Sequence, residues 1–114
     1  MTDKVPSEDQ EQMLFVQWFR RTHPGVLIHS VPNGGHRHIA VAAKLKATGS
    51  VAGIPDLFIP AWNLWVEMKR QKGGVLSAEQ REIINYLEGV GHAVIIGKGC
   101  EDAKTKLMEL RDDR

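Results

Sequence analysis

Three residues near the middle of the sequence have the types and the spacing of a metal-dependent hydrolytic site. Ten residues separate Asp56 from Glu67, and one residue separates Glu67 from Lys69. Two carboxylates and a main-chain carbonyl suit a hard, oxygen-seeking cation such as Mg²⁺. A lysine beside that cation would orient or activate the attacking water and offset charge on a phosphoryl group. The pattern therefore predicts phosphoryl chemistry assisted by a divalent metal ion.

Each of these residues alone also fits an ordinary structural role. A Glu-x-Lys pair on a strand commonly forms a weak, solvated ion pair. An Asp that follows Gly-x-Pro is typical of a turn. The chemical interpretation therefore depends on the order and spacing of all three residues together.

The surrounding sequence predicts a β-hairpin that would bring the two carboxylates together. Two short apolar runs, 58–59 and 64–68, are separated by Pro-Ala-Trp-Asn, which is typical of a hairpin loop. Asp56 would lie at the start of the first strand and Glu67 near the end of the second. Because alternate side chains of a strand share a face, Glu67 and Lys69 would project together.

Gly53-Ile-Pro-Asp56 followed by Val66-Glu-Met-Lys69 resembles the signature of the PD-(D/E)XK nuclease superfamily. More narrowly, it is similar to the VRR-NUC domain, which occurs alone in phage and bacterial proteins. The resemblance implies a DNA endonuclease that uses Mg²⁺, with Mn²⁺ as a possible substitute. It implies that Asp56, Glu67 and the backbone carbonyl of Met68 bind the metal, and that Lys69 acts on the attacking water.

The resemblance also bears on the substrate and on the assembly. Stand-alone domains of this kind are associated with branched DNA, including four-way (Holliday) junctions, and with homodimers. A two-fold dimer can place identical sites on two symmetry-related strands. Cleavage of flaps, nicks or linear ends by the same site is an alternative. A DNA-binding module without catalysis is a weaker one, because a binder does not need all three site residues.

The first predicted helix, residues 7–22, contributes two further acidic candidates. At about 100° per residue, Glu8 and Glu11 project onto its apolar side, where a carboxylate needs a partner such as a metal or a lysine. Equally, both would be stabilised by the positive N-terminus of the helix. In the resembling family this helix carries a Glu with a Gln four positions later, which matches Glu8 and Gln12. The resemblance therefore ranks Glu8 above Glu11 as a group near the metal.

Gln80 is the candidate on a later helix. Ser77 and Gln80 form the capping-box pattern that opens a helix, and Gln80 lies on the same stripe as Ile83, Ile84 and Leu87. Capping alone would account for this glutamine. In the resembling family, however, a Gln on this helix faces the active site. The resemblance thus implies that Gln80 helps to order the site.

Positive charge is concentrated in the part of the sequence that holds the candidate carboxylates. Residues 20–72 carry eight Lys or Arg against two acidic residues, although the net charge of the chain is +1. Contacts from Lys and Arg to phosphates dominate affinity for nucleic acids, so this segregation favours DNA, although a charged stretch of sequence need not form a surface patch. The candidate DNA contacts are Asn33, Arg37, Lys44, Lys46, Arg70 and Lys72. Lys44 and Lys46 would equally suit the negative C-terminal end of a helix.

Composition is that of an ordinary globular domain. The 114 residues are 42% hydrophobic and 25% charged, and Cys100 is the single cysteine, so no intrachain disulfide can form. No apolar run approaches the roughly 20 residues of a membrane span, and the N-terminus lacks the apolar core of a signal peptide. We expect one domain over residues 1–114, a cytoplasmic location and no membrane partner.

The order of predicted elements indicates an α/β fold. The expected helices cover 7–22, 39–47, a segment that opens at Ser77, and 101–111; the expected strands cover 26–31, 58–59, 64–68 and 92–96. The last two strands are joined through a helix, so this crossover should be right-handed and the strands parallel. We expect a small mixed sheet of about four strands flanked by helices. This is also the restriction-endonuclease-like PD-(D/E)XK core that the resemblance implies.

Overall fold

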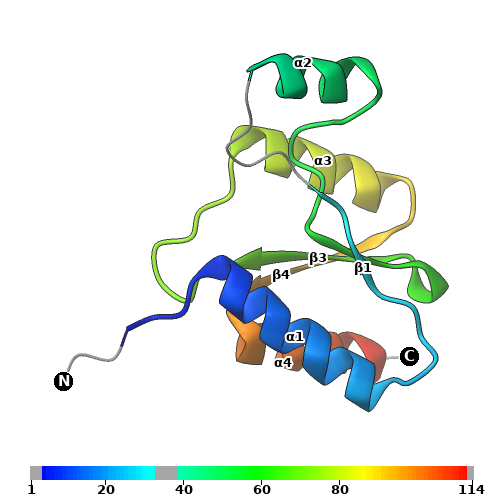
Figure 1. Ribbon diagram of the computed structural model, residues 1–114. Coiled ribbons are helices and arrows are strands. Elements are labelled where there is room, and N and C mark those ends of the chain that lie inside the picture. Colours follow the sequence, from blue (N-terminus) through cyan, green and yellow to red (C-terminus); the bar gives the residue numbers. More distant parts are fainter. Residues whose placement is uncertain (1–3, 33–38, 113–114) are drawn as a thin grey trace.

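The computed structural model describes residues 4–32 and 39–112, and the elements follow the predicted order (Figure 1). They are α1 (Glu8–Thr22), β1 (His29–Ser30), α2 (Ile39–Ala47), β2 (Leu57–Ile59), β3 (Leu64–Lys69), α3 (Ala78–Gly89), β4 (Ala93–Lys98) and α4 (Cys100–Asp112), with a 3₁₀ turn, η1 (Pro60–Trp62), between β2 and β3.

The four strands form one mixed sheet in the order β1-β2-β3-β4. Strand β2 is antiparallel to β1 and β3, whereas β4 is parallel to β3. The predicted hairpin and the predicted parallel crossover are therefore both confirmed. In the hairpin Leu57 pairs with Val66. One step further along the same register, Asp56 lies opposite Glu67.

Helices cover both faces of the sheet, with α3 on one face and α1 and α4 on the other (Figure 1). The hydrophobic core lies on the side of α1 and α4, where Leu64, Val66 and Met68 of β3 are almost fully buried. Because strand side chains alternate, Glu67 and Lys69 point to the opposite face, toward α3. The core consists of Phe15, Phe19, Ile28, Leu57, Ile59, Leu64, Val66, Met68, Ile95, Cys100, Ala103 and Leu107.

The first strand is shorter than predicted. Its sequence suits a strand over 26–31, but β1 contains only His29 and Ser30. Its neighbour β2 has three residues and offers few pairing positions. The backbone groups before β1 bond elsewhere: the N–H of Val26 donates to the carbonyl of His23, and Arg20 donates to the carbonyl of Ile28.

Helix α2 has the predicted bounds but contributes nothing to the core. None of its residues is buried, and it projects beyond α3 in Figure 1. Lys44 and Lys46 lie in its last turn and are exposed. No helix in the described part of the chain is long and apolar enough to cross a membrane.

Candidate active site

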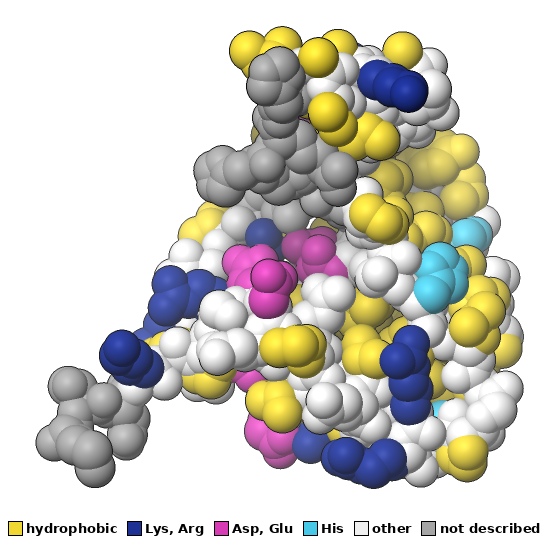
Figure 2. Space-filling model, viewed as in Figure 1, with side chains coloured by type: hydrophobic (Ala, Val, Ile, Leu, Met, Phe, Trp, Pro, Cys, Tyr) yellow, Lys and Arg dark blue, Asp and Glu magenta, His cyan; other side chains and the backbone are white. Residues whose placement is uncertain are grey.

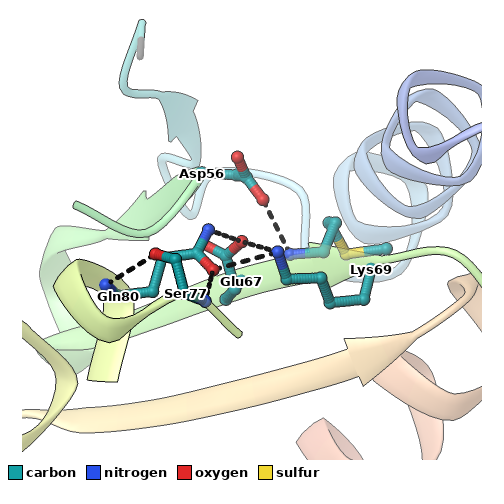
Figure 3. A network of polar contacts seen from close by, with 6 residues as sticks. Asp56, Glu67, Lys69, Ser77 and Gln80 are labelled. Carbon is teal, nitrogen blue, oxygen red and sulfur yellow. Dashed lines mark hydrogen bonds and ion pairs between the residues drawn. The ribbon is translucent and has the colours of Figure 1, made fainter. Parts of the chain in front are cut away.

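Asp56 and Glu67 meet on the face of the sheet that α3 covers. Leu57 and Ile59 point into the core, so alternation places Asp56 on the other face, together with Glu67. Backbone N–H groups bond both the main chain and the side chain of Asp56. Its carbonyl accepts a 2.8 Å hydrogen bond from the N–H of Val31, and its Oδ2 accepts a 2.7 Å hydrogen bond from the N–H of Met68. Figure 3 shows the carboxylate next to the backbone of β3.

Glu67 is buried, with an exposed fraction of 2%. Its Oε2 accepts a 2.9 Å hydrogen bond from Nε2 of Gln80 and lies 3.5 Å from Nζ of Lys69. In the described part of the chain, Oε1 of Glu67 is buried without a hydrogen-bond partner. An unsatisfied buried oxygen is costly, so an electropositive ligand at Oε1 would relieve this cost.

The electrostatics of the pair disfavour two negative charges. Burial, followed by the nearby charge of Asp56, raises the pKa of Glu67 to about 7, although Lys69 opposes the shift. Burial, followed by the charge of Glu8, also raises the pKa of Asp56, against the hydrogen bond from Met68. A bound cation would relieve both effects, because it favours the charged form of a neighbouring carboxylate.

Lys69 is held in the same cluster. Only 7% of the residue is exposed, and its Nζ donates a 3.0 Å hydrogen bond to Oε1 of Gln80. Together with the ion pair to Glu67, this contact fixes the ammonium group above the end of β3 (Figure 3). A buried cation beside a buried carboxylate is a costly arrangement that requires such partners.

Gln80 both caps α3 and contacts two other candidate residues. It completes the capping box of α3, because its backbone N–H donates to Oγ of Ser77 and its Oε1 accepts from the N–H of Ser77. The same side chain contacts Lys69 through Oε1 and Glu67 through Nε2. The cap and the site contact therefore coexist, because a carbonyl oxygen can accept two hydrogen bonds.

Gly53 brings the segment that carries Asp56 close to α3. Its φ is +91°, and a Cβ atom at this position would lie 2.7 Å from the backbone carbon of Glu79. Only glycine combines this conformation with so close an approach. In the sequence, the signal for this close approach is the glycine of Gly53-Ile-Pro-Asp56. The need for a glycine becomes evident only when the first turn of α3 is placed beside it.

The two N-terminal glutamates occupy different environments. Glu11 is 2% exposed; its Oε1 accepts from the backbone N–H of Cys100 and its Oε2 accepts from Nε2 of Gln71. It therefore caps the start of α4 and holds the segment after β3. Glu8 lies near enough to Asp56 and Glu67 for its charge to raise the pKa of both. Gln71 belongs to no motif that would mark it in advance.

Within residues 4–32 and 39–112, no three His, Cys, Asp or Glu side chains are grouped so that they could hold a metal ion. Any metal at the Asp56–Glu67 pair would therefore also draw on groups other than these side chains. The backbone carbonyl of Met68, on the strand between Glu67 and Lys69, is of the required chemical type.

The candidate DNA contacts are spread over separate parts of the molecule. Asn33 and Arg37 lie outside the described residues. Lys44 and Lys46 lie on the projecting helix α2, and Arg70 and Lys72 are exposed directly after β3. On the face shown in Figure 2, acidic side chains gather near the centre, and Lys and Arg side chains lie around them.

One solved structure, described as a "VRR_NUC domain protein", is similar to this chain. The two superpose with a TM-score of 0.78 and share 26% sequence identity, and the match covers 94% of this chain and 89% of the other. No family model and no curated protein matches the sequence. The four-stranded mixed sheet with helices on both faces is thus the restriction-endonuclease-like fold, as predicted.

Proposed function

We propose that the chain is a nuclease domain of the VRR-NUC type, like the solved structure that it resembles, and that it hydrolyses phosphodiester bonds in DNA with the help of a divalent metal ion. We further propose that residues 1–114 form a single nuclease domain. One observation carries the proposal: the buried carboxylate of Glu67 and the half-buried carboxylate of Asp56 lie together beside a buried lysine, Lys69.

The residues at this position fit a hard divalent cation. Oε1 of Glu67 is buried and lacks a partner among the described residues, and oxygen donors are those that Mg²⁺ and Mn²⁺ prefer. Asp56, Glu67 and the backbone carbonyl of Met68 would hold the ion, with Glu8 as a nearby acidic group. When bound, the ion would supply Lewis-acid activation of water and of a phosphoryl oxygen.

The protein's own side chains would orient the reacting groups. Lys69, held by Gln80 and Glu67, would donate hydrogen bonds to the attacking water or to a phosphate oxygen and would offset the charge that develops there. Gln80 would keep the ammonium group directed at the substrate. The bond from the N–H of Met68 would fix the rotamer of Asp56. In this scheme Glu11 is structural.

The substrate that we propose is branched DNA, in particular four-way junctions, cut by a homodimer. A two-fold dimer presents two identical sites, as paired cuts in a symmetric junction require. Cleavage of flaps, nicks or linear ends by the same side chains is the second candidate. A DNA-binding module without activity is the third, and the burial of Glu67 and Lys69 disfavours it because such costly groups are usually functional.

The test of the proposed function is cleavage of a matched set of end-labelled DNAs: a four-way junction, a flap and a linear duplex. We expect cleavage with Mg²⁺ and none with EDTA, and we expect paired symmetric cuts in the junction. Preferential cutting of flaps or linear ends would favour the second candidate. Tight binding without cleavage of any of these DNAs, with either Mg²⁺ or Mn²⁺, would eliminate the enzymatic function.

The raised pKa of Glu67 predicts how pH affects metal binding. In the unfolded chain Glu67 titrates near its usual 4.5, whereas in the metal-free folded protein it titrates at about 7. Its contribution to folding stability is thus present below the unfolded value and is lost as pH rises through the folded value. The metal binds the ionised form, so Mg²⁺ should raise the melting temperature more at about pH 8.5 than at about pH 5.5.

This prediction is checked by thermal melts with Mg²⁺ or EDTA at several pH values. Glu67→Gln is the matched control, because it keeps the shape of the side chain and removes the titration. An equal Mg²⁺ effect at all pH values in the wild type would contradict the assignment of Glu67 as a ligand.

A further inference from the structure

A cavity of about 760 Å³ lies where the segment before α1, the outer side of α1 and the residue after β3 meet. Its volume is within the range of roughly 300–1,000 Å³ that is typical of ligand sites. The residues on which its chemistry depends are Lys4, Val5, Pro6, Met13, Leu14 and Arg70.

The floor of this cavity is apolar. Val5 and Pro6 line it from the extended segment, and Met13 and Leu14 line it from α1. Met13 is 56% exposed and Leu14 is 50% exposed, so no described part of the chain covers them. Large apolar side chains that share one concave surface are typical of a binding site.

Two unpaired cations stand at the cavity. In the described part of the chain, neither Lys4 nor Arg70 lies within ion-pair distance of a carboxylate. Both side chains are exposed. The surface therefore joins an apolar floor to free positive charge, and this combination complements a ligand with both an apolar face and an anionic group.

The position of the cavity links it to the candidate site. Ser7 is one of its lining residues and directly precedes Glu8, whose charge acts on Asp56 and Glu67. Arg70 directly follows Lys69. Helix α1 also packs against β3 (Figure 1). The cavity is therefore lined by the direct sequence neighbours of two candidate site residues, Glu8 and Lys69.

We propose that this cavity binds an unpaired nucleotide of the DNA substrate, with the base against Met13 and Leu14 and the phosphates toward Lys4 and Arg70. In a duplex both faces of each base are stacked, so duplex DNA would use only the cations. An unpaired base exposes an apolar face that can pack against such a floor. The inference rests on the proposed nuclease function and narrows its substrate to branched DNA that has unpaired nucleotides beside the bond that is cut.

Binding measurements in EDTA test this inference without depending on cleavage. The probes are a fluorescently labelled duplex with a short single-stranded flap and a blunt duplex of the same paired sequence, compared by anisotropy. The wild type is expected to bind the flap more tightly. In Met13→Ser/Leu14→Ser the flap affinity should fall about tenfold, while the affinity for blunt duplex should stay unchanged.

Met108→Ser is the matched control. Met108 is 47% exposed on α4 and does not line the cavity, so its replacement should leave both affinities unchanged. Because Met13 and Leu14 are half-exposed, the double variant is expected to fold, which circular dichroism would check. Lys4→Gln, at an exposed position, provides a second variant that should also weaken flap binding.

The outcomes separate this inference from the proposed function. Equal wild-type affinity for flap and blunt duplex, or an unchanged flap preference in the double variant, would overturn the inference even if Mg²⁺-dependent cleavage occurs. If the wild type binds the flap more tightly but cuts no DNA, the inference about the cavity holds and the proposed nuclease activity is excluded. Dissociation of a dimer by the double variant, with unchanged flap binding, would show that a second copy of the chain occupies the cavity.

Discussion

Replacing Lys69 by methionine is expected to lower the rate of DNA cleavage by at least about 100-fold. Methionine keeps the length and packing of the buried stem but removes the ammonium group that contacts Gln80 and Glu67. The attacking water would then lose a hydrogen-bond donor, and the charge that develops on the phosphate would lose its nearest cation from the protein. Glu67 would also lose its counter-charge, so its pKa should rise further.

The measurement is single-turnover cleavage with saturating Mg²⁺, together with DNA binding in EDTA. Binding should change little, because a buried lysine contributes little to affinity for the duplex. Lys98→Ala is the control: Lys98 pairs with Lys69 in the register of β3 and β4 but is exposed. If Lys69→Met kept more than about a tenth of the wild-type rate, a role for Lys69 in the chemical step would be excluded.

Gly53→Ala adds one methyl group. We expect it to destabilise the structure around the site more than a methyl group added at any other position there. A residue with a side chain at φ +91° pays about 1–3 kcal/mol in backbone strain. The added Cβ would also lie 2.7 Å from backbone atoms of Glu79, which cannot move without displacing the first turn of α3. Asp56 follows three residues later and Gln80 lies in that turn, so cleavage should fall together with stability.

Gly25→Ala is the matched control for this contact. Gly25 has nearly the same φ, +88°, but nothing lies within 4 Å of its added Cβ. It should therefore show the backbone cost alone, and the difference between the two variants in free energy of unfolding measures the contact with α3. Equal unfolding free energies, obtained by urea denaturation, would show that the segment before Asp56 does not pack on the helix as described.

The meeting of Asp56 and Glu67 was predictable because it depends on local rules. A hairpin with a short loop fixes the register, and alternation then decides which side chains share a face. The same rules placed Glu67 and Lys69 together. The first strand was overestimated because a favourable pattern over 26–31 carries no information about its partner, which is only three residues long.

Helical periodicity alone could not distinguish Glu8 from Glu11, and only the family resemblance ranked Glu8 higher. A helical projection gives the direction of a side chain around its axis but not what lies opposite. The partner of Glu11 is the N–H of Cys100, 89 residues away, at the start of another helix. The cavity beside Met13 and Leu14 is non-local for the same reason, because it forms only when the N-terminal segment and Arg70 come together.

Gln80 both caps α3 and contacts Lys69 and Glu67, so the arrangement of the site depends on whether the first turn of α3 is intact. Helix termini open locally far more often than the whole domain unfolds. Each time the Ser77–Gln80 turn opens, Lys69 and Glu67 lose their shared partner at the same moment. In the proposed nuclease, the fraction of molecules that keep these contacts would therefore follow a local equilibrium at the start of α3, and it could change while the global stability of the domain stays constant.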